Sequence, residues 1–502
     1  MSVNVMTRNR TMELGELALA VPGARIAGEK NTWVSGMAFD SRRIVRGDLF
    51  FAVPGLNLDG HDFAASAVAA GAAALVLEHE VDGLSGDIPR IFVPSSREAM
   101  ALLAGAYYGH PSGSLALAGV TGTNGKTTTA FLIDAILRAA GRTTGLMGTI
   151  HYRVGDRIVE NPRTTSEAPD VQYYLAEMLE AGASHAVMEV SSHALAMDRV
   201  MGCEFAAAVF TNLTQDHLDF HGDMESYFQA KLRLFTEFSP GVSILNIDDP
   251  AGEKIAAAAG GEVRTFGLSG DADVRAEGLS VSADGMVFDL VCLEGRERLE
   301  TTLTGHHNAS NILAASAACL VLGLNLGEIA GGAASLESVP GRFEKVDLGQ
   351  PFLVVVDYAH TEDALARVLE FARPVTSGRL LTLMGCGGDR DKRKRPLMAA
   401  AALRSSDLVF MTSDNPRTED PGAILREVEA GADLVEGGRE RARAIVDRRE
   451  AIRCIIADAG AGDTVLIAGK GHETYQIVGD RQLPFDDREE AREALRLAGY
   501  GE

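Results

Sequence analysis

Short apolar runs alternate with polar loops through the first part of the chain. Residues 48–53 and 72–77 are apolar, and Gly, Pro and charged residues separate them. This pattern is typical of a small α/β domain. Residues 185–189 and 206–211 are further apolar runs of strand length. We therefore expect an α/β arrangement from the start of the chain to about residue 339.

One of these runs leads into a glycine-rich loop. The segment LALAGV at residues 115–120 enters TGTNG, and residues 126–140 then show helical spacing. Phe131, Leu132, Ile136 and Leu137 fall on one side of that segment. The pattern predicts a strand, a loop and a helix in succession.

The last third has a different pattern, because its apolar runs are continuous and each ends directly in polar residues. These runs cover residues 352–356, 380–384, 408–411 and 464–468. Continuous runs that alternate with helical segments indicate a buried, mostly parallel sheet.

Two turn-forming segments divide the chain. HPSGS at residues 110–114 marks the first boundary, and Pro340-Gly341 marks the second. A length of 502 residues also favours about three domains. We therefore expect domains at residues 1–113, 114–339 and 340–502.

Composition narrows the class of protein. A net charge of -23 argues against binding to nucleic acid or to anionic membranes, and no apolar stretch approaches the roughly 18 residues that insert into a bilayer. The start of the chain has no signal-peptide pattern. The five cysteines are scattered without a CxxC pair, which favours a reducing compartment and no structural zinc. We expect a cytoplasmic protein with no membrane insertion.

The glycine-rich loop predicts a phosphate site. Glycines let backbone N–H groups approach phosphate oxygens, the helix N-terminus favours anions, and the lysine adds a positive charge. The following threonine can place its hydroxyl on Mg²⁺. The general motif would have glycine at position 120, where this chain has Val120. The loop consists of Gly122, Thr123, Asn124, Gly125, Lys126, Thr127 and Thr128.

Two further polar positions follow apolar runs. Glu189 ends the run at 185–189, and its carboxylate is a suitable hard ligand for Mg²⁺. His217 and His221 are four residues apart, as in a zinc pair on a helix, but no third ligand of suitable type lies close in sequence. Zinc and a second Mg²⁺ site that uses His217 with Glu189 are the two alternatives.

Motifs along the whole chain resemble the Mur ligases. They are GTNGKTTT (122–129), MEVSSHAL (188–195), TNLTQDHLDFHG (211–222), YFQAKLRLF (227–235), PGRFE (340–344), DYAHTEDAL (357–365), GCGGDRDKRKRPLM (385–398), DNPR (414–417) and AGKGHE (468–473). The segments FDSRRIVRGDLFFAVPG (39–55) and DGHDF (59–63) look like the UDP-binding domain of the members of this family that form the tripeptide precursor.

The resemblance implies a fold and a reaction. The fold is a UDP-binding α/β domain, a central P-loop ATPase-like domain with a parallel sheet and a C-terminal Rossmann-like domain. In the reaction, ATP phosphorylates the γ-carboxylate of D-Glu in UDP-MurNAc-L-Ala-D-Glu, and an incoming amine displaces phosphate in peptidoglycan precursor synthesis. An acyl phosphate has a good leaving group, which a free carboxylate lacks, and its formation needs positioning and charge neutralisation.

The resemblance also implies roles for individual residues. Lys126, Glu189, His217 and Lys231 match catalytic positions, and Mg²⁺ would be held by Thr127, Glu189, His217 and a CO2-derived carbamate on Lys231. Besides the loop, ATP contacts are implied for Asn308, Arg342, Asp357 and His360. Contacts to the UDP substrate are implied for Ser41, Arg42, Thr164, Thr165, Ser191 and Arg199. The chain departs from the family pattern at Met197, where glutamine is common, and at Glu362, where proline is usual.

The C-terminal motifs bear on the amino acid that is added. Arg417 of DNPR offers a planar fork for a carboxylate, and meso-diaminopimelate differs from lysine by a carboxylate at its far end. Glu473 suits the far ammonium. The expected pocket consists of Arg390, Asp414, Asn415, Pro416, Arg417, Gly469 and Glu473.

The resemblance thus favours a ligase that adds meso-diaminopimelate and acts as a monomer. The alternatives are a lysine-adding ligase of the same fold, a ligase similar to folylpolyglutamate synthetase, and a degenerate nucleotide-binding scaffold. Lysine-adding relatives lack the arginine that matches Arg417, folylpolyglutamate synthetase lacks the N-terminal DSRR segment, and a scaffold would not need Lys126, Glu189, His217 and Lys231 together.

Overall fold

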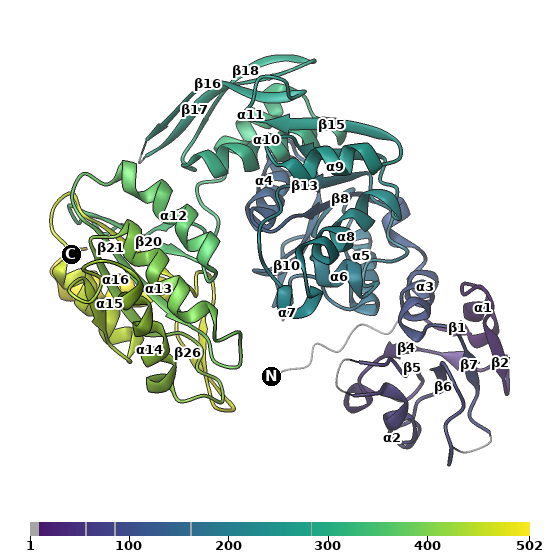
Figure 1. The fold of residues 1–502 in the computed structure, drawn as a ribbon. Coiled ribbons are helices and arrows are strands. Elements are labelled where there is room, and N and C mark those ends of the chain that lie inside the picture. The colour runs from purple at the N-terminus through teal and green to yellow at the C-terminus, as the bar shows by residue number, and fades with distance from the viewer. Residues whose placement is uncertain (1–9, 56–57, 85–86, 161–162, 283, 502) are drawn as a thin grey trace.

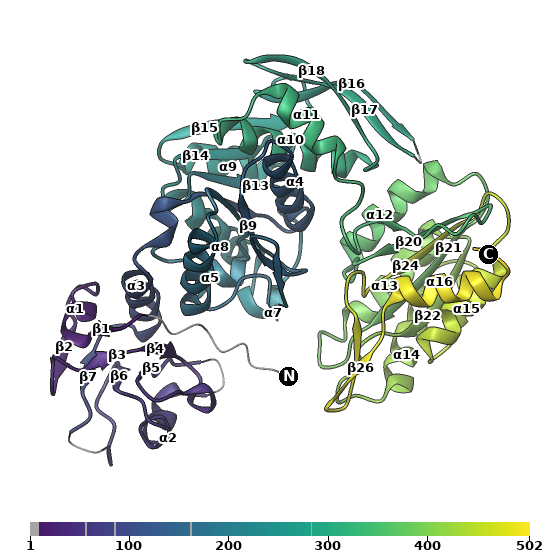
Figure 2. The same cartoon turned by 180° about the vertical axis from the view of Figure 1, so that it is seen from behind.

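The computed structural model describes residues 10–55, 58–84, 87–160, 163–282 and 284–501. Its three large sheets are formed by separate stretches of the chain, and the central stretch lies between the other two in space (Figures 1 and 2). The proposed boundaries near residues 113 and 339 fall between these sheets. We call the three parts the N-terminal, central and C-terminal lobes.

The N-terminal lobe has a five-stranded sheet of order β2-β7-β6-β5-β4, parallel except for β2. Apolar clusters cover both faces of this sheet. The predicted apolar runs 48–53 and 72–77 contain β5 and β6. The elements are β1 (Met12–Glu13), α1 (Leu14–Ala18), β2 (Arg25–Ala27), β3 (Trp33–Val34), β4 (Gly36–Ala38), η1 (Ser41–Arg43), β5 (Asp48–Phe51), η2 (Gly60–Phe63), α2 (Ala64–Ala69), β6 (Ala74–Leu77), β7 (Arg90–Phe92), α3 (Ser96–Tyr108) and η3 (Pro111–Ser114).

The central lobe has an eleven-stranded sheet. Its strands are β8 (Ala116–Thr121), β9 (Thr144–Met147), β10 (Tyr152–Val154), β11 (Arg157–Val159), β12 (His185–Glu189), β13 (Ala207–Phe210), β14 (Val242–Asn246), β15 (Glu262–Gly267), β16 (Val274–Ser282), β17 (Gly285–Cys292) and β18 (Gly295–Thr301). Its helices are α4 (Lys126–Ala139), α5 (Ala168–Glu180), α6 (Ser192–Ala196), α7 (Leu218–His221), α8 (Met224–Thr236), α9 (Pro250–Ala258), α10 (His306–Val321) and α11 (Leu326–Ala334).

The middle of this sheet is parallel, as predicted, from β9 through β12, β8, β13, β14 and β15 to β16. Antiparallel strands that the apolar pattern did not predict extend both edges, β10–β11 on one side and β17–β18 on the other. The predicted strand 185–189 is confirmed as β12. The predicted helix is confirmed as α4, which buries Leu132, Ile136 and Leu137 against one face of the sheet.

The C-terminal lobe has a six-stranded sheet of order β19-β20-β24-β21-β22-β23, parallel except for β19, so the predicted Rossmann-like sheet is confirmed. Helices cover both of its faces, as Figure 1 shows. The elements are β19 (Glu344–Lys345), β20 (Leu353–Asp357), α12 (Glu362–Val375), β21 (Leu380–Cys386), α13 (Lys394–Ser405), β22 (Leu408–Ser413), α14 (Pro421–Glu429), η4 (Ala430–Leu434), β23 (Ala442–Ala444), α15 (Arg448–Asp458), β24 (Thr464–Ala468), β25 (Tyr475–Val478), β26 (Arg481–Pro484) and α16 (Asp487–Leu497).

The described helices include none with the length and apolar character that crossing a membrane requires.

Candidate active site

The phosphate loop joins β8 to α4 in the central lobe. Gly122 has φ of 148° and Gly125, which caps α4, has φ of 86°, conformations that favour glycine. A methyl group on Gly122 would lie 1.9 Å from Thr211 Oγ1, so the loop also needs glycine there for space. The side chain of Lys126 folds back, and its Nζ donates to the carbonyl oxygens of Gly122 at 2.9 Å and Thr123 at 2.8 Å. Burial lowers the pKa of Lys126, and the nearby Glu189 and Asp216 oppose that shift.

Glu189 ends β12, which pairs directly with β8, and its carboxylate is fully buried beside the loop. Thr127 Oγ1 donates to Glu189 Oε2 at 2.9 Å, and Thr149 donates to Oε1 through its amide at 2.7 Å and to Oε2 through its hydroxyl at 3.0 Å. Adjacent ligands of an octahedral Mg²⁺ ion, each at about 2.1 Å, lie roughly 2.9 Å apart. The oxygen atoms of Thr127 and Glu189 therefore fit neighbouring ligand positions of one Mg²⁺ ion.

Lys231 of α8 also contacts the phosphate loop. Its side chain is 1% exposed, and its Nζ donates to the Gly122 carbonyl at 2.8 Å and lies 4.4 Å from the centre of the Tyr227 ring. The Gly122 carbonyl therefore accepts from two lysines, Lys126 and Lys231. Burial lowers the pKa of Lys231 well below its ordinary value, and the positive charge of Lys126 lowers it further.

His217 lies at the N-cap of α7 with φ of 53°, and its Nε2 is 3.4 Å from Asp216 Oδ2. Burial lowers the pKa of His217 to about 4, and Lys126 and Lys231 contribute to that shift while Asp216 opposes it. A neutral imidazole of this kind can ligate a metal. His221 lies at the other end of the same short helix, and its Nε2 is 3.0 Å from Ser192 Oγ.

A separate cluster of potential metal ligands lies in the N-terminal lobe. Within the described ranges, a group of potential ligand atoms lying within 4.8 Å of one another is formed by Asp59, His61 and His79 of the N-terminal lobe. His61 Nδ1 is 2.6 Å from Asp59 Oδ1, and its Nε2 accepts from the Glu78 amide at 3.0 Å. Both ring nitrogens of His61 are therefore engaged in hydrogen bonds, and the group holds a turn together.

The C-terminal lobe contacts the phosphate loop through two side chains. Arg342 Nη2 donates to Thr127 Oγ1 at 3.2 Å while its guanidinium lies 4.6 Å from the Tyr358 ring centre. Asp363, in the first turn of α12, accepts from Asn124 Nδ2 at 3.4 Å and from Thr214 Oγ1 at 2.9 Å. The sequence predicted Arg342 but missed Asp363, since an acidic residue in a first helical turn usually needs no further explanation.

The other predicted nucleotide residues surround this contact. Asp357 ends β20, is buried and accepts from the amides of Phe343 and Ala359, each at 2.8 Å, and burial raises its pKa. His360 Nδ1 is 2.9 Å from the carbonyl of Tyr358.

Asn308 lies behind the loop and takes part in a chain of buried amides. Its Nδ2 donates to the Thr304 carbonyl at 2.9 Å, and its Oδ1 accepts from Asn311 at 3.1 Å. Asn311, which the sequence missed, in turn accepts from Thr129 Oγ1 at 3.4 Å and packs against Gly125.

Three predicted residues for the UDP substrate form one hydrogen-bonded group next to Glu189. Thr165 Oγ1 donates to the Glu189 carbonyl at 2.8 Å and accepts from the Ser191 amide at 3.1 Å, while Arg199 donates to the Thr165 carbonyl at 3.1 Å. At the departure from the family pattern, the Met197 sulfur lies 3.4 Å from Arg199 Nη2. The group is therefore bonded to the backbone carbonyl of Glu189 at the end of β12.

Of the remaining predicted contacts to the UDP substrate, Thr164 lies near this group and two residues lie in the N-terminal lobe. Thr164 Oγ1 is 3.0 Å from Thr149 Oγ1. Ser41 and Arg42 belong to the turn η1, where the exposed guanidinium of Arg42 pairs with Asp40 at 2.7 and 2.9 Å. Ser41 and Arg42 thus belong to the N-terminal lobe, whereas the phosphate loop belongs to the central lobe.

The residues predicted for the amino-acid pocket follow the carboxyl ends of β21, β22 and β24. Arg417 has φ of 52°, and its Nη1 donates to the Gly388 carbonyl at 2.8 Å. A methyl on Gly387 would lie 2.8 Å from Arg417 Nη1 and 3.9 Å from Arg390 Cγ, so Gly387 lies between the two arginines. Gly469, with φ of 119°, donates its amide to the Asp357 carbonyl at 3.0 Å. One residue predicted for the amino acid, Gly469, is thus hydrogen-bonded to one predicted for the nucleotide, Asp357.

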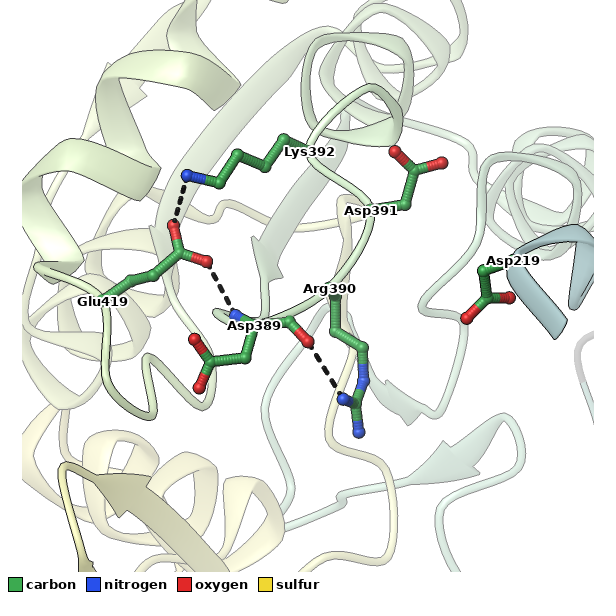
Figure 3. A pocket seen from close by; sticks show the side chains of 6 residues that line it. All are labelled: Asp219, Asp389, Arg390, Asp391, Lys392 and Glu419. Carbon is green, nitrogen blue, oxygen red and sulfur yellow. Dashed lines mark hydrogen bonds and ion pairs between the residues drawn. The ribbon is translucent and has the colours of Figure 1, made fainter. Parts of the chain in front are cut away.

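Beside Arg390 lies a cavity of about 480 Å³ between two lobes. Asp219 lines it from α7 of the central lobe, opposite the loop that carries Arg390, as Figure 3 shows. Arg390 Nη1 donates to the Asp389 carbonyl at 3.1 Å, and Glu419 accepts from the Asp389 amide at 2.7 Å. The lining residues are Asp219, Asp389, Arg390, Asp391, Lys392 and Glu419.

Taken together, a phosphate loop with a buried carboxylate and two lysines, contacted by a second α/β lobe, defines a ligase that uses a nucleoside triphosphate. Comparison with known protein families agrees with this class. Residues 34–108 match the Mur ligase family catalytic domain, residues 120–319 match the Mur ligase middle domain, and residues 341–471 match the Mur ligase glutamate ligase domain. The chain belongs to the Mur ligase family.

Full-length relatives share nearly half of their aligned residues with this chain. UDP-N-acetylmuramoyl-L-alanyl-D-glutamate--2,6-diaminopimelate ligase of Geobacillus kaustophilus (strain HTA426) is 48% identical over 97% of this chain and 100% of its own length. The protein of the same name from Solibacter usitatus (strain Ellin6076) is 47% identical over 97% and 99%. A solved structure of a ligase of that name superposes with a TM-score of 0.69 at 34% identity, covering 98% of this chain and 100% of the other.

Folylpolyglutamate synthase of Mycobacterium tuberculosis, solved with ADP and AMPPCP, shares the fold over part of the chain. Its TM-score is 0.61 at 20% identity, covering 75% of this chain and 92% of its own. This likeness extends to the fold alone.

Proposed function

We propose that this protein is an ATP-dependent ligase that joins meso-diaminopimelate to the γ-carboxylate of D-Glu in UDP-MurNAc-L-Ala-D-Glu, in peptidoglycan precursor synthesis. The observation that carries the choice of amino acid is the position of Arg417 after β22, where its guanidinium donates to the Gly388 carbonyl in the loop after β21. The full-length relatives named for this reaction support it.

The first step needs a γ-phosphate and a carboxylate in contact. The amides of the phosphate loop and Lys126 neutralise the triphosphate, and Arg342, already on Thr127, adds a positive charge from the C-terminal lobe. The group of Thr165, Ser191 and Arg199 presents the D-Glu carboxylate next to Glu189. The amine then attacks the acyl carbon of the acyl phosphate that forms, so that the amide C–N bond forms, the bond from that carbon to the phosphate oxygen breaks, and inorganic phosphate leaves as the amine gives up a proton.

Mg²⁺ fits the oxygen atoms near the loop. Thr127 and Glu189 would hold it, with the neutral imidazole of His217 as a further ligand. When bound, the ion neutralises charge on the phosphates during transfer. Thr149 bonds to both oxygen atoms of the Glu189 carboxylate and so fixes the orientation in which this carboxylate would bind the ion.

A CO2-derived carbamate on Lys231 is part of the proposal. Carbamate formation requires an unprotonated amine, and the burial that lowers the pKa of Lys231 favours one. The modification would place a negative charge beside Lys126 and so favour the charged form of that buried lysine. It would also supply oxygen atoms suited to Mg²⁺.

The amino-acid pocket discriminates by charge. Arg417 offers two parallel N–H groups to the far carboxylate of meso-diaminopimelate, and Glu473 offers an acceptor to its far ammonium. Lysine lacks that carboxylate and would leave the guanidinium without its partner. We further propose that the enzyme is monomeric and works in the cytoplasm.

The experiment measures phosphate release by the purified protein with ATP, Mg²⁺ and UDP-MurNAc-L-Ala-D-Glu, and compares meso-diaminopimelate with L-lysine as the added amino acid. Mass spectrometry then determines the mass of the product. We expect phosphate and a tripeptide product with diaminopimelate alone. Product with lysine would keep the fold and the chemistry but refute the role of Arg417. No product with either amino acid would refute the function.

A further inference from the structure

A buried lysine that the proposed chemistry does not use lies under the amino-acid pocket. Lys470 follows Gly469 at the end of β24, and its side chain is 0% exposed. Its Nζ is 2.9 Å from Glu473 Oε2, 3.2 Å from Asn415 Oδ1 and 3.5 Å from Asp414 Oδ1. An ammonium group has three N–H donors, and here each has one acceptor. The buried charge is therefore fully compensated by residues of the pocket.

Asn415 connects this ammonium to the rest of the pocket. Its Oδ1 accepts from Lys470 Nζ and from the Ile477 amide at 2.9 Å, which occupies both lone pairs. Its Nδ2 donates to Glu473 Oε2 at 2.9 Å. Asn415 is 4% exposed, so this amide orients its neighbours from beneath the pocket.

Glu473 is fixed by the same contacts. Both bonds, from Lys470 and Asn415, fall on Oε2, which leaves Oε1 as the oxygen turned to a ligand. The side chains of Asp414 and Glu473 are 13% and 17% exposed, so both border the pocket, whereas Lys470 does not. One cation between two carboxylates leaves a net charge of about −1 at this end of the pocket, which suits one ammonium group.

The hairpin β25–β26 is hydrogen-bonded both to Asp414 and Asn415 and to the backbone of Arg417. Gln476 Nε2 donates to the Asp414 carbonyl at 2.6 Å. The Arg417 amide donates to the Ile477 carbonyl at 3.0 Å, and the Arg417 carbonyl accepts from the Gly479 amide at 2.7 Å. These two bonds hold Arg417 at φ of 52°, a conformation that is rare for a residue with a side chain.

We propose that Lys470, through Asn415 and the hairpin at residues 475–484, is the positioning residue of the amino-acid pocket. Its ammonium fixes Glu473 at one end, and the hairpin that bonds to the same asparagine fixes Arg417 at the other. The distance between the acceptor for the far ammonium and the donor for the far carboxylate is thereby set by one buried network. This inference rests on the proposed function and adds to it a specificity-determining element that does not touch the substrate.

The test measures kcat and KM for each of the three substrates in Lys470→Met. We expect KM for meso-diaminopimelate to rise at least about 30-fold, equivalent to about 2 kcal/mol, with KM for ATP and for the UDP substrate within about threefold of wild type. A lysine that only stabilised the fold would shift all three together or lower kcat alone. Lys254→Met, which removes an exposed lysine of α9, is the matched control and should change none of them.

A second variant keeps the test decisive if Lys470→Met does not fold. Gln476→Leu removes one hydrogen bond to the loop of Asp414 and should raise KM for diaminopimelate about fivefold, with Gln229→Leu, which removes an exposed glutamine of α8, as its control. Lys470→Arg, which keeps the charge, should recover part of the affinity lost in Lys470→Met.

The outcomes separate the two proposals. Wild-type protein that forms no product with diaminopimelate refutes the function itself. Active wild type, with unchanged diaminopimelate KM in Gln476→Leu and in any folded Lys470→Met, refutes the positioning role and leaves the function standing.

Discussion

Replacing Gly122 by alanine tests whether the phosphate loop has the shape described here. The added methyl would lie 1.9 Å from Thr211 Oγ1 and 3.1 Å from the Asn212 amide. Thr211 has little freedom to move away, because its hydroxyl donates to the Asn124 carbonyl at 2.6 Å. The substitution therefore strains the backbone at φ of 148° and pushes against a side chain that holds the loop.

The two effects can be given magnitudes. A residue with a side chain in this region of φ costs about 1–3 kcal/mol, and forced overpacking costs about 1–3 kcal/mol more. We expect Gly122→Ala to lower the free energy of unfolding by about 2–6 kcal/mol and ATP affinity by at least about tenfold. Gly182→Ala isolates the backbone effect, since Gly182 has φ of 81° and nothing within 4 Å of an added methyl. It should cost about 1 kcal/mol.

A double-mutant cycle with Thr211→Ala measures the contact itself. Removing the hydroxyl should relieve the overlap, so the double variant should be about 1–3 kcal/mol more stable than the sum of the single changes implies. Urea unfolding and calorimetric titration with an ATP analogue give the two quantities. Gly122→Ala that is no less stable than Gly182→Ala, or that binds ATP normally, would refute this description of the loop.

Three other substitutions test separate parts of the site. Lys231→Ala should reduce turnover at least about a hundredfold, with partial recovery by short-chain carboxylates that fill the vacated space; full activity without them would remove the carbamate hypothesis. Arg417→Ala should raise KM for diaminopimelate about a hundredfold and change that for ATP less than threefold, while equal losses would show that its role is wrongly assigned. Asp170→Asn tests a pH-dependent contribution to stability. Burial raises the pKa of Asp170 from 3.8 to about 6, so between these pH values the folded state binds more protons than the unfolded state. Stability therefore falls as the pH rises through this range. The variant should lack that fall and gain at most about 3 kcal/mol at pH 7, and an unchanged pH profile in urea unfolding would contradict the shift.

The elements that the sequence predicted well are those with local signals. The strand at residues 185–189 is an apolar run, and the helix after the phosphate loop has apolar periodicity and a glycine turn before it; the structure has both elements. The strand β16, which lies between β15 and β17, was not predicted, because its residues alternate between partly buried and exposed and its pairing with β17 contains a register shift. Such a strand depends on its partner more than on its own composition.

The parts of the site that sequence reasoning missed depend on contacts between distant segments. Asp363 is an ordinary first-turn carboxylate until Asn124, 239 positions earlier, lies beside it. Asn311 is one polar residue in an alanine-rich helix until Gly125 packs against it. No local pattern contains these pairings, because they follow from how the lobes and helices pack.

Lys470 shows the same limit most clearly. A lysine between two glycines reads as a solvated turn residue, since lysine is rarely buried unless it is paired. Its acceptors come from Asp414 and Asn415, more than 50 positions away, and from Glu473 three positions on. Only the parallel pairing of β21 with both β22 and β24 brings these two loops to the same edge of the sheet. Burial of this charge is thus a property of the sheet order, and the pocket above it has the same origin.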